Sequence, residues 1–295
     1  MIVAFASGKG GTGKTTITTN LAAALDRMGR PVQVLDCDVE EPNCHLFLQP
    51  ESTRKTVVNV PLPVVDEESC TLCGACANLC QFGAILQFAD RIMMVPELCL
   101  SCGGCKLVCT DGAITEKPEE VGVVTEGRVR GIDFVEGRLK VGVARAIPVI
   151  SKVKECMMRD RIVLIDAPPG TSCPMLESVK DVEFACLVAE PTPFGLNDLK
   201  IAVGGVRQLD LPVGIVINRA DMGDDQLKHY CEAENIEVLM ELPNDRRIAE
   251  VCSTGGLIVD ALPEYRSKFT SLLKQLLERT GNPVSRVVDS TGIDK

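Results

Sequence analysis

The N-terminal stretch IVAFASGKGGTGKT, residues 2–15, contains the motif from which the fold can be predicted. A short apolar run, Ile2 to Ala6, leads into a glycine-rich loop with the pattern G-x-x-x-x-G-K-S/T, and a helical pattern follows from Lys14 to about Met28. In such a strand–loop–helix unit, loop N–H groups and the helix N-terminus bind phosphate oxygens. We therefore expect a phosphate loop, the alternative being a glycine-rich turn without a ligand. The residues expected to contact the nucleotide are Gly8, Lys9, Gly10, Gly11, Thr12, Gly13, Lys14, Thr15 and Thr16.

The alternation of strand and helix returns in the second half of the chain. An apolar run from Val32 to Leu35 follows the first helix, and RIVLIDAP, FACLVAEP and LPVGIVINR after position 160 each read as a buried strand. Shorter signals at Ile236–Leu242 and Leu257–Val259 suggest one or two further strands. We expect an α/β fold, a mostly parallel P-loop NTPase sheet flanked by helices.

A second lysine, Lys9, makes the phosphate loop more specific. Read with the TTNLA helix start, K-G-G-x-G-K-T resembles the deviant Walker A motif of the family that contains MinD, ParA, the Mrp-type cluster carriers and the nitrogenase iron protein. In that family the first lysine reaches the nucleotide bound by the partner subunit. The resemblance thus implies that Lys9 acts in trans in a homodimer, or in a heterodimer with a paralogue; a solvated loop lysine is the alternative.

The resemblance also implies roles for aspartates at the ends of two predicted strands. Asp36 and Asp38, in LDCDVEEPN, occupy the switch position where the family orients Mg²⁺ and the attacking water, and Asp166 in RIVLID matches the Walker B aspartate. Strand-end aspartates are otherwise common as caps or turn residues. The expected catalytic residues of this ATPase are Lys9, Lys14, Asp38 and Asp166, and the expected Mg²⁺ site comprises Thr15, Asp36, Asp38 and Asp166.

The identity of the base depends on two further segments. Asn218-Arg219-Ala220-Asp221 superficially matches the guanine signature N-K/R-x-D. The resembling family has an Asn-Arg after this strand, where the asparagine reads adenine, and a later Pro-x-Asp loop. Pro243 to Asp245 supply that loop here. ATP is therefore favoured over GTP, with Asn218, Arg219, Pro243 and Asp245 as the base-binding residues.

Cysteine and glycine dominate between about Pro61 and Pro118, where the strand–helix alternation stops. ESCTLCGACANLCQFGAI from Glu68 and ELCLSCGGCKLVCTDGAI from Glu97 are two copies of one unit. An insertion is the simplest account, because the units on either side need each other to complete a sheet. We expect a discontinuous P-loop ATPase domain, residues 1–60 and 119–295, and an inserted domain, residues 61–118. Residues 121–142 resemble a β-hairpin returning to the main domain.

Each copy has the bacterial ferredoxin spacing C-x2-C-x2-C-x3-C. Three cysteines at this spacing wrap one corner of an iron–sulfur cubane, and the fourth cysteine of each run ligates the other cluster in two-cluster ferredoxins. The inserted segment thus predicts a bacterial-type ferredoxin (α+β) domain, and the whole chain resembles MinD-superfamily ATPases that contain one. The expected ligands are Cys70, Cys73, Cys76 and Cys109 for one 4Fe–4S cluster and Cys80, Cys99, Cys102 and Cys105 for the other.

Two tetrahedral zinc sites are the alternative, because four thiolates also suit Zn²⁺. Zinc knuckles usually separate two C-x2-C pairs by longer loops. Gln81 and Thr110 stand where ferredoxins usually place proline after the fourth cysteine, a departure that affects local geometry rather than ligation.

The formal net charge of −10 gives no general attraction to nucleic acid or anionic lipid. The N-terminus has no features of a secretory signal, and no stretch reaches the roughly 18 apolar residues that a membrane span needs. We expect a cytoplasmic protein without nucleic-acid partners or stable membrane association, and the polar tail Asn282–Lys295 agrees with this. In a reducing compartment clustered cysteines favour metal over disulfides, and eight of the fifteen fall between positions 70 and 109. The other seven, Cys44 among them, are interpreted as small buried hydrophobes.

Three functions fit these features. The first is a Mg-ATP-dependent redox protein in which dimer switching is coupled to electron transfer to a protein partner. The second is an iron–sulfur carrier or assembly factor, although Cys231 and Cys252 do not form the C-x-x-C pair of Mrp-type carriers. The third is a MinD/ParA-like positioning ATPase with an amphipathic C-terminal helix, but such a stripe is usually a packed helix face. That stripe comprises Tyr265, Phe269, Leu272, Leu273, Leu276 and Leu277.

Overall fold

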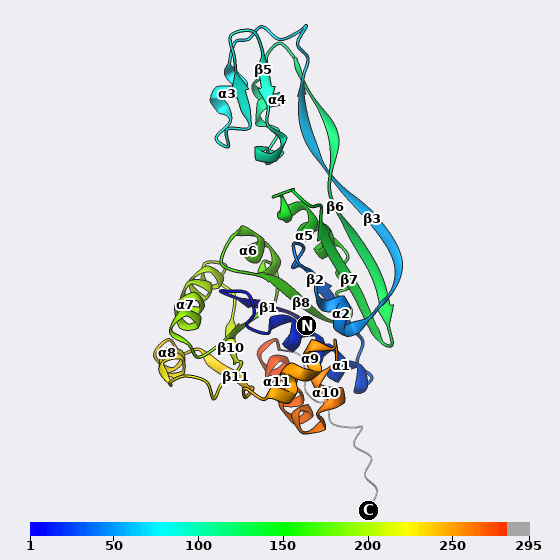
Figure 1. The fold of residues 1–295 in the computed structure, drawn as a ribbon, viewed down its shortest axis with the longest axis vertical. Helices are drawn as coiled ribbons and strands as arrows, with labels where there is room; N and C mark the ends of the chain where they lie inside the picture. Colours follow the sequence, from blue (N-terminus) through cyan, green and yellow to red (C-terminus); the bar gives the residue numbers. More distant parts are fainter. Residues whose placement is uncertain (282–295) are drawn as a thin grey trace, which may run out of the picture.

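The computed structural model describes residues 1–281, which form a nine-stranded sheet covered by helices, with a long two-stranded ribbon extending from one edge (Figure 1). Neighbouring strands from β11 to β7 pair in parallel, and β7, β6 and β3 pair antiparallel. The mostly parallel α/β sheet predicted from the sequence is therefore confirmed. The strands in spatial order are β11 (Glu237–Glu241), β10 (Val213–Ile217), β9 (Phe184–Ala189), β1 (Ile2–Ser7), β8 (Ile162–Pro169), β2 (Val32–Asp36), β7 (Ile132–Leu139), β6 (Ile114–Val129) and β3 (Glu51–Val65).

Two apolar layers cover the sheet because its central strands are buried on both faces. One layer is centred on residues such as Val149 and Leu199, and the other on residues such as Leu21 and Phe269. The first layer includes α5 (Ala146–Glu155), α6 (Cys173–Val179), α7 (Pro193–Arg207) and α8 (Gln226–Ala233). The second includes α1 (Lys14–Arg27), α2 (Cys44–Leu48), α9 (Arg246–Ser253), α10 (Ile258–Ala261), η2 (Pro263–Tyr265) and α11 (Arg266–Arg279).

The C-terminal part of this layer confirms one prediction and corrects another. The apolar stripe of α11 is buried, as expected for the packed face of a helix. The strand predicted at Leu257–Val259 is wrong, because this segment begins helix α10. Ile258 and Val259 are β-branched and favour strands, but both are fully buried, and the Val259 N–H donates to Asn20 Oδ1 of α1 at 3.0 Å. Tertiary packing here overrides local propensity.

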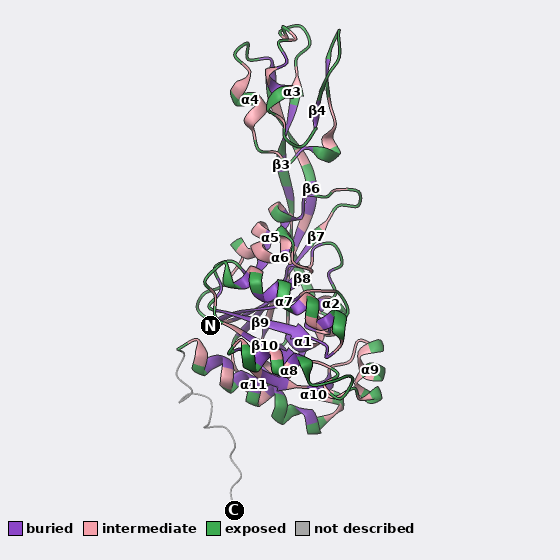
Figure 2. Ribbon diagram, turned by 90° about the vertical axis from the view of Figure 1, so that its left-hand side faces the viewer, coloured by how far each residue is buried: buried purple, intermediate pink, exposed green. Residues whose placement is uncertain are grey.

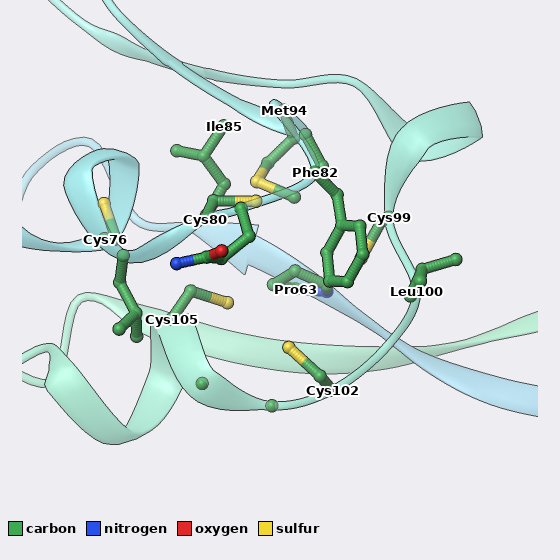
Figure 3. Close-up of a pocket in the computed structure, with 15 residues that line it drawn as sticks. Pro63, Cys76, Cys80, Phe82, Ile85, Met94, Cys99, Leu100, Cys102 and Cys105 are labelled. Atoms are coloured by element: carbon green, nitrogen blue, oxygen red, sulfur yellow. The ribbon is translucent and has the colours of Figure 1, made fainter.

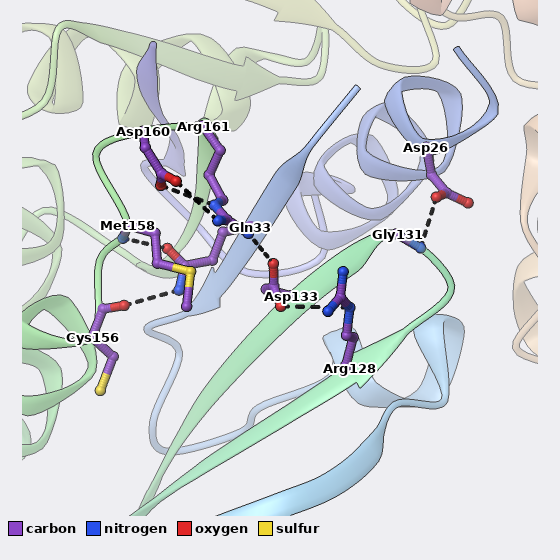
Figure 4. Close-up of polar contacts among 9 residues, drawn as sticks. All are labelled: Asp26, Gln33, Arg128, Gly131, Asp133, Cys156, Met158, Asp160 and Arg161. Carbon is purple, nitrogen blue, oxygen red and sulfur yellow. Dashed lines mark hydrogen bonds and ion pairs between the residues drawn. The ribbon is translucent and has the colours of Figure 1, made fainter. Parts of the chain in front are cut away.

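A hairpin confirms the prediction for residues 121–142, although its first strand is longer than expected. β6 and β7 pair antiparallel around the turn at Arg130 and Gly131. The turn is fixed to the core, since the Gly131 N–H donates to Asp26 Oδ1 of α1 at 2.9 Å (Figure 4). Asp133 of β7 forms an ion pair with Arg161 just before β8, also drawn in Figure 4. The base of the hairpin is therefore anchored to α1 and to the segment that leads into β8.

The ribbon formed by β3 and β6 carries residues 66–113, which we call the cysteine module, at its far end (Figures 1 and 2). The module contains α3 (Ala75–Leu79), α4 (Gly104–Val108), η1 (Pro96–Leu98), and the short hairpin of β4 (Ile85–Gln87) and β5 (Ile92–Met94). Pro61 and Pro118, where we expected the domain boundaries, lie opposite one another in the ribbon. Strand β3, whose first residues are mostly exposed, was not predicted from the sequence.

The tail Asn282–Lys295 lies outside the described residues. None of the described helices is long and apolar enough to cross a membrane.

Candidate functional site

The glycine-rich loop connects β1 to α1 at the carboxyl edge of the sheet. Gly11 and Gly13 have positive φ angles of 76° and 94°, a conformation that residues with a Cβ rarely adopt. A Cβ at Gly13 would also lie 2.5 Å from Asn218 Nδ2. The helix then begins at Lys14, with the Ile17 N–H donating to the Gly13 carbonyl at 3.0 Å. The predicted strand–loop–helix unit is present.

Lys14 is a buried cation at the start of α1. It is 6 % exposed, and no carboxylate oxygen of residues 1–281 lies within the 4.0 Å of an ion pair. Burying an ammonium group without a close counterion is unfavourable. The arrangement therefore provides a binding position for an anion, as a phosphate loop requires.

Asp36 and Asp166 lie side by side because they are paired residues of adjacent strands β2 and β8. Both are fully buried. Asp166 accepts hydrogen bonds from the hydroxyls of Thr15 at 2.6 Å and Thr18 at 3.1 Å. Asp36 accepts hydrogen bonds from the backbone N–H groups of Asn43 and Cys44, at 3.0 and 2.9 Å.

Two buried carboxylates at this spacing oppose each other's ionisation. Burial first, and then the charge of Asp166, raise the pKa of Asp36 well above its ordinary value. Burial also raises the pKa of Asp166, while Lys14 and the threonine hydroxyls act in the opposite direction. A bound divalent cation would relieve this repulsion. Three of the residues expected to hold Mg²⁺, namely Thr15, Asp36 and Asp166, are thus brought together.

Asp38 is half-buried near the same group, and the structure adds a cysteine that the sequence analysis treated as a small buried hydrophobe. Burial raises the pKa of Asp38 to about 6, with Lys14 opposing the shift and Asp166 adding to it. Cys44 Sγ lies 3.6 Å from Asp166 Oδ2. Ligand atoms of Asp36, Cys44 and Asp166 all lie within 4.8 Å of one another. Only the three-dimensional arrangement brings Cys44 into this group, because its spacing in the sequence matches no metal motif.

Lys9 is held by a residue that the sequence analysis did not identify. Its ammonium lies 3.1 Å from Glu190 Oε2, just after β9, and its side chain is 31 % exposed. The guanidinium of Arg219 binds the other oxygen of Glu190 at 2.6 Å. Glu190 therefore ties the phosphate loop to one of the segments expected to contact the base.

The two segments expected at the base lie next to each other. Asn218 Nδ2 donates to the Thr12 carbonyl at 2.8 Å, so its amide supports the phosphate loop directly. The Ala220 N–H donates to the Leu242 carbonyl, immediately before Pro243, at 2.8 Å. Asp245 caps α9 and accepts a hydrogen bond from Tyr265 Oη at 2.8 Å. The carboxylate of Asp245 is thus engaged within the protein.

In the cysteine module, the sulfurs surround two hollows. A cavity of about 250 Å³ is lined by Cys80, Cys99, Cys102 and Cys105, with Cys76 at its margin (Figure 3). A narrower cavity of about 20 Å³ is lined by Cys70, Cys73, Cys76 and Cys109. Each hollow combines three cysteines of one repeat with the fourth cysteine of the other repeat. These are the two sets named in the sequence analysis, with Cys76 lining both hollows.

The two repeats also share a backbone conformation. Leu72 and Ser101 both have φ 57°, and Gly74 and Gly103 have φ 75° and 73°. These left-handed residues sit between the cysteines of each C-x2-C-x2-C run. The Ser101 N–H points at Cys99 Sγ, 3.4 Å away. Each repeat therefore forms the same tight loop around its hollow.

The separation of the sulfurs bears on which metal group the module fits. Four thiolates on one Zn²⁺, each at about 2.3 Å, would lie about 3.8 Å from one another. Among the described residues, no three cysteines of the module have sulfurs within 4.8 Å of one another. An iron–sulfur cubane places each thiolate on a different iron and needs a wider cage. The donor sets and the larger cavity fit a cluster better than a single ion.

The fold and the phosphate loop together define a P-loop nucleotide-binding protein. Residues 3–258 match the family model of the CobQ/CobB/MinD/ParA nucleotide binding domain, and the chain belongs to this family of P-loop ATPases.

Two relatives from Methanocaldococcus jannaschii illustrate the range of similarity. An uncharacterized protein is 32 % identical over 281 residues, which cover 95 % of this chain and 96 % of that protein. An iron-sulfur cluster carrier protein is 24 % identical and covers 92 % of this chain and 82 % of its own length. Among solved structures, the septum site-determining protein MinD of Pyrococcus horikoshii, complexed with Mg-ADP, has a TM-score of 0.58 at 20 % identity, covering 93 % of this chain and 95 % of that one. At that identity the likeness shows the fold.

Proposed function

We propose that this chain is a Mg-ATP-hydrolysing protein whose cysteine module is an inserted ferredoxin-like domain holding two 4Fe–4S clusters. Nucleotide-driven dimer switching would be coupled to electron transfer through these clusters to a protein partner. One observation carries the proposal: the ribbon that bears the cysteines is hydrogen-bonded into the same sheet as the nucleotide site. β6 pairs with β7, and β7 pairs with β2, whose last residue is Asp36.

The cysteine sets described above would hold the two clusters, which supply one-electron transfer when bound. The polypeptide holds the donors in the module at the end of the paired strands β3 and β6. It also alternates the repeats, so that each hollow depends on both halves of the module. A change in the direction of the ribbon relative to the rest of the sheet would therefore move both hollows together.

The segment after β2 provides a route from nucleotide to ribbon. The Leu139 N–H at the end of β7 donates to the Val39 carbonyl at 2.7 Å. His45 Nδ1 of α2 lies 2.6 Å from Glu136 Oε2 of β7, so α2 contacts this strand directly. Any rearrangement of residues 37–45 around Mg-ATP would act on β7 at both points. Because β6 pairs along β7, the movement would reach the cysteine module.

Dimer switching rests on Lys9. In this structure Lys9 pairs with Glu190 of its own chain. To contact a nucleotide bound by a second subunit, the lysine must exchange this carboxylate for phosphate, and Arg219 remains to neutralise Glu190. The ion pair is partly exposed, so replacing it costs little free energy.

Metal analysis and EPR on anaerobically prepared protein test the cluster assignment. We expect about eight iron and eight sulfide per chain and EPR signals of reduced 4Fe–4S centres after dithionite treatment. A preparation that contains only zinc after anaerobic expression and reconstitution would overturn the proposal. Hydrolysis of ATP by the wild type, abolished in the Lys14→Ala variant, tests the ATPase assignment on the same material.

A second candidate is an iron–sulfur carrier, favoured by relatives named iron-sulfur cluster carrier proteins. The lone Cys231 is buried and Cys252 is half-buried, in different helices, which weighs against a bridging site there. Incubation of the iron-loaded protein with an apo-ferredoxin separates the candidates. Transfer of iron on the timescale of ATP hydrolysis supports a carrier, and retention of all iron through many turnovers supports the redox function.

A further inference from the structure

Only two cationic side chains are buried among residues 1–281, and they lie in different parts of the molecule. One is Lys14 of the phosphate loop. The other is Arg145, which immediately precedes α5 and is 7 % exposed. No carboxylate of the described chain lies within 4.0 Å of its guanidinium. The residues that the structure describes therefore supply no ion-pair partner for Arg145.

The guanidinium of Arg145 is directed at the second cysteine repeat. Its Nη1 donates to the Cys99 carbonyl at 3.2 Å and approaches Ser101 Oγ at 3.4 Å. Cys99 and Cys102 on either side of this loop line the larger cavity. Neutral oxygens satisfy the hydrogen-bonding capacity of a guanidinium only in part and leave its charge uncompensated. Burial of such a charge is unfavourable unless an anion lies nearby.

We propose that Arg145 is the counter-cation of an anionic metal cluster bound by Cys80, Cys99, Cys102 and Cys105. This inference rests on the proposed function, which assigns a four-thiolate cluster to that cavity. Such a cluster carries net negative charge, and a fixed cation beside it favours the more reduced form. Arg145 is a positioning residue, because its contacts reach the loop that bears the ligands.

Within residues 1–281 no buried cation stands beside the first repeat, which makes the two sites unequal. Leu72 has the same φ as Ser101, but its carbonyl accepts a hydrogen bond from the neutral amide of Gln87 at 2.7 Å. The cluster held by Cys80, Cys99, Cys102 and Cys105 should therefore have the higher reduction potential of the two. Electrons would collect at the site that faces the ATPase domain.

Arg145 also begins a connection to the nucleotide site. The α5 helix packs on α6, with Ser151 Oγ donating to Glu177 Oε1 at 3.2 Å and Lys154 Nζ donating to the Glu177 carbonyl at 2.6 Å. The α6 helix follows β8, the strand that contains Asp166, and the short loop 170–172. The larger cavity is therefore the one connected to the nucleotide site through α5 and α6.

EPR-monitored redox titration without nucleotide tests the inference on Arg145→Gln, Arg145→Lys and Lys106→Gln. Lys106 is the matched control, because it follows Cys105 but is half-exposed and paired with Glu116. In iron-replete protein, Arg145→Gln should lower one midpoint potential and leave the other unchanged. Arg145→Lys should stay close to wild type, and Lys106→Gln should change neither potential. Unchanged potentials in Arg145→Gln, or an equal shift in Lys106→Gln, would overturn the inference.

Arg145→Gln could also lose the cluster held by Cys80, Cys99, Cys102 and Cys105, and Arg145→Lys is the control for that outcome. If this variant retains about half of the iron, Arg145→Lys must retain all of it, because the lysine keeps the charge. If both variants lose the same iron, shape rather than charge is required, and the inference fails. Absence of iron from the wild type is a different result, since it removes the proposed function itself.

Discussion

At the scale of single residues, Gly13 links the phosphate loop to the segment that follows β10. Its φ of 94° is strained for any residue with a Cβ, and that Cβ would lie 2.5 Å from Asn218 Nδ2. Asn218 cannot move away without losing its bond to the Thr12 carbonyl. The position therefore demands glycine for two independent reasons.

We predict that Gly13→Ala severely weakens ATP binding measured by isothermal titration calorimetry. Gly142→Ala is the matched control, because Gly142 also has positive φ, 83°, but a Cβ there meets nothing within 4 Å. Both variants carry backbone strain of about 1–2 kcal/mol, so thermal stability should fall in both. Only Gly13→Ala should lose nucleotide affinity; equal affinities in the two variants would contradict the packing described.

Several residues of the site could not be found from the sequence. The phosphate loop follows a spacing that local geometry imposes, so it could be predicted from the residues alone. The roles expected of Asp36, Asp38 and Asp166 came instead from the resemblance to a known family. Glu190 and Arg145 act through partners distant in the chain, Lys9 and Cys99, and no sequence pattern connects them. Cys44 resembled any other buried cysteine until β2 and β8 placed it beside Asp166.

At the scale of elements, the two cysteine repeats are interdependent. Cys80 lines the cavity with the second repeat, and Cys109 lines the cavity with the first. We predict that Cys80→Ala removes the cluster held by Cys99, Cys102 and Cys105, whereas Cys109→Ala removes the other. Each variant should retain about half of the iron, with a different EPR signal missing. Loss of the same signal from both variants would disprove this pairing.

The contact of α2 with β7 yields a test of coupling. We predict that His45→Ala retains Mg-ATP binding but loses most of any nucleotide effect on the EPR signals, because His45 bridges to Glu136. His229→Ala is the control, since it removes the only other histidine, which is exposed in α8. A nucleotide response in His45→Ala as large as in His229→Ala would exclude this route.

Element prediction succeeded where periodicity and burial agree. The apolar runs of β1, β8, β9 and β10 are buried on both faces and read clearly in the sequence. β3 was not predicted because its first half is exposed and its partner β6 lies beyond the cysteine module. α10 was mistaken for a strand because four residues are too few to show a helical period.

At the scale of the whole molecule, the cysteine module stands at the end of a ribbon and contains mostly exposed or half-buried residues (Figure 2). The base of the same ribbon is anchored to α1 through Asp26 and Gly131. In the proposed mechanism, a ribbon of this form would transmit movements near Asp36 to the cysteines at its far end. It also leaves the module accessible to a second protein.

At this scale, the role proposed for Lys9 implies that two chains associate when ATP binds. We predict that the Asp38→Ala variant, which should bind but not hydrolyse Mg-ATP, becomes dimeric by light scattering in saturating nucleotide. Adding Lys9→Ala to it should leave nucleotide affinity within about threefold and return the mass to a monomer, because Arg219 still neutralises Glu190 within the chain. An Asp38→Ala variant that stays monomeric in saturating Mg-ATP would contradict the dimer mechanism.

The most direct test of coupling is an EPR-monitored redox titration of the iron-loaded protein, with and without Mg-ATP. The Lys14→Ala variant serves as the control that cannot bind nucleotide. We predict that Mg-ATP shifts the midpoint potential of at least one cluster in the wild type and neither potential in Lys14→Ala. Identical potentials in the wild type with and without saturating Mg-ATP would show that the clusters and the ATPase site work independently.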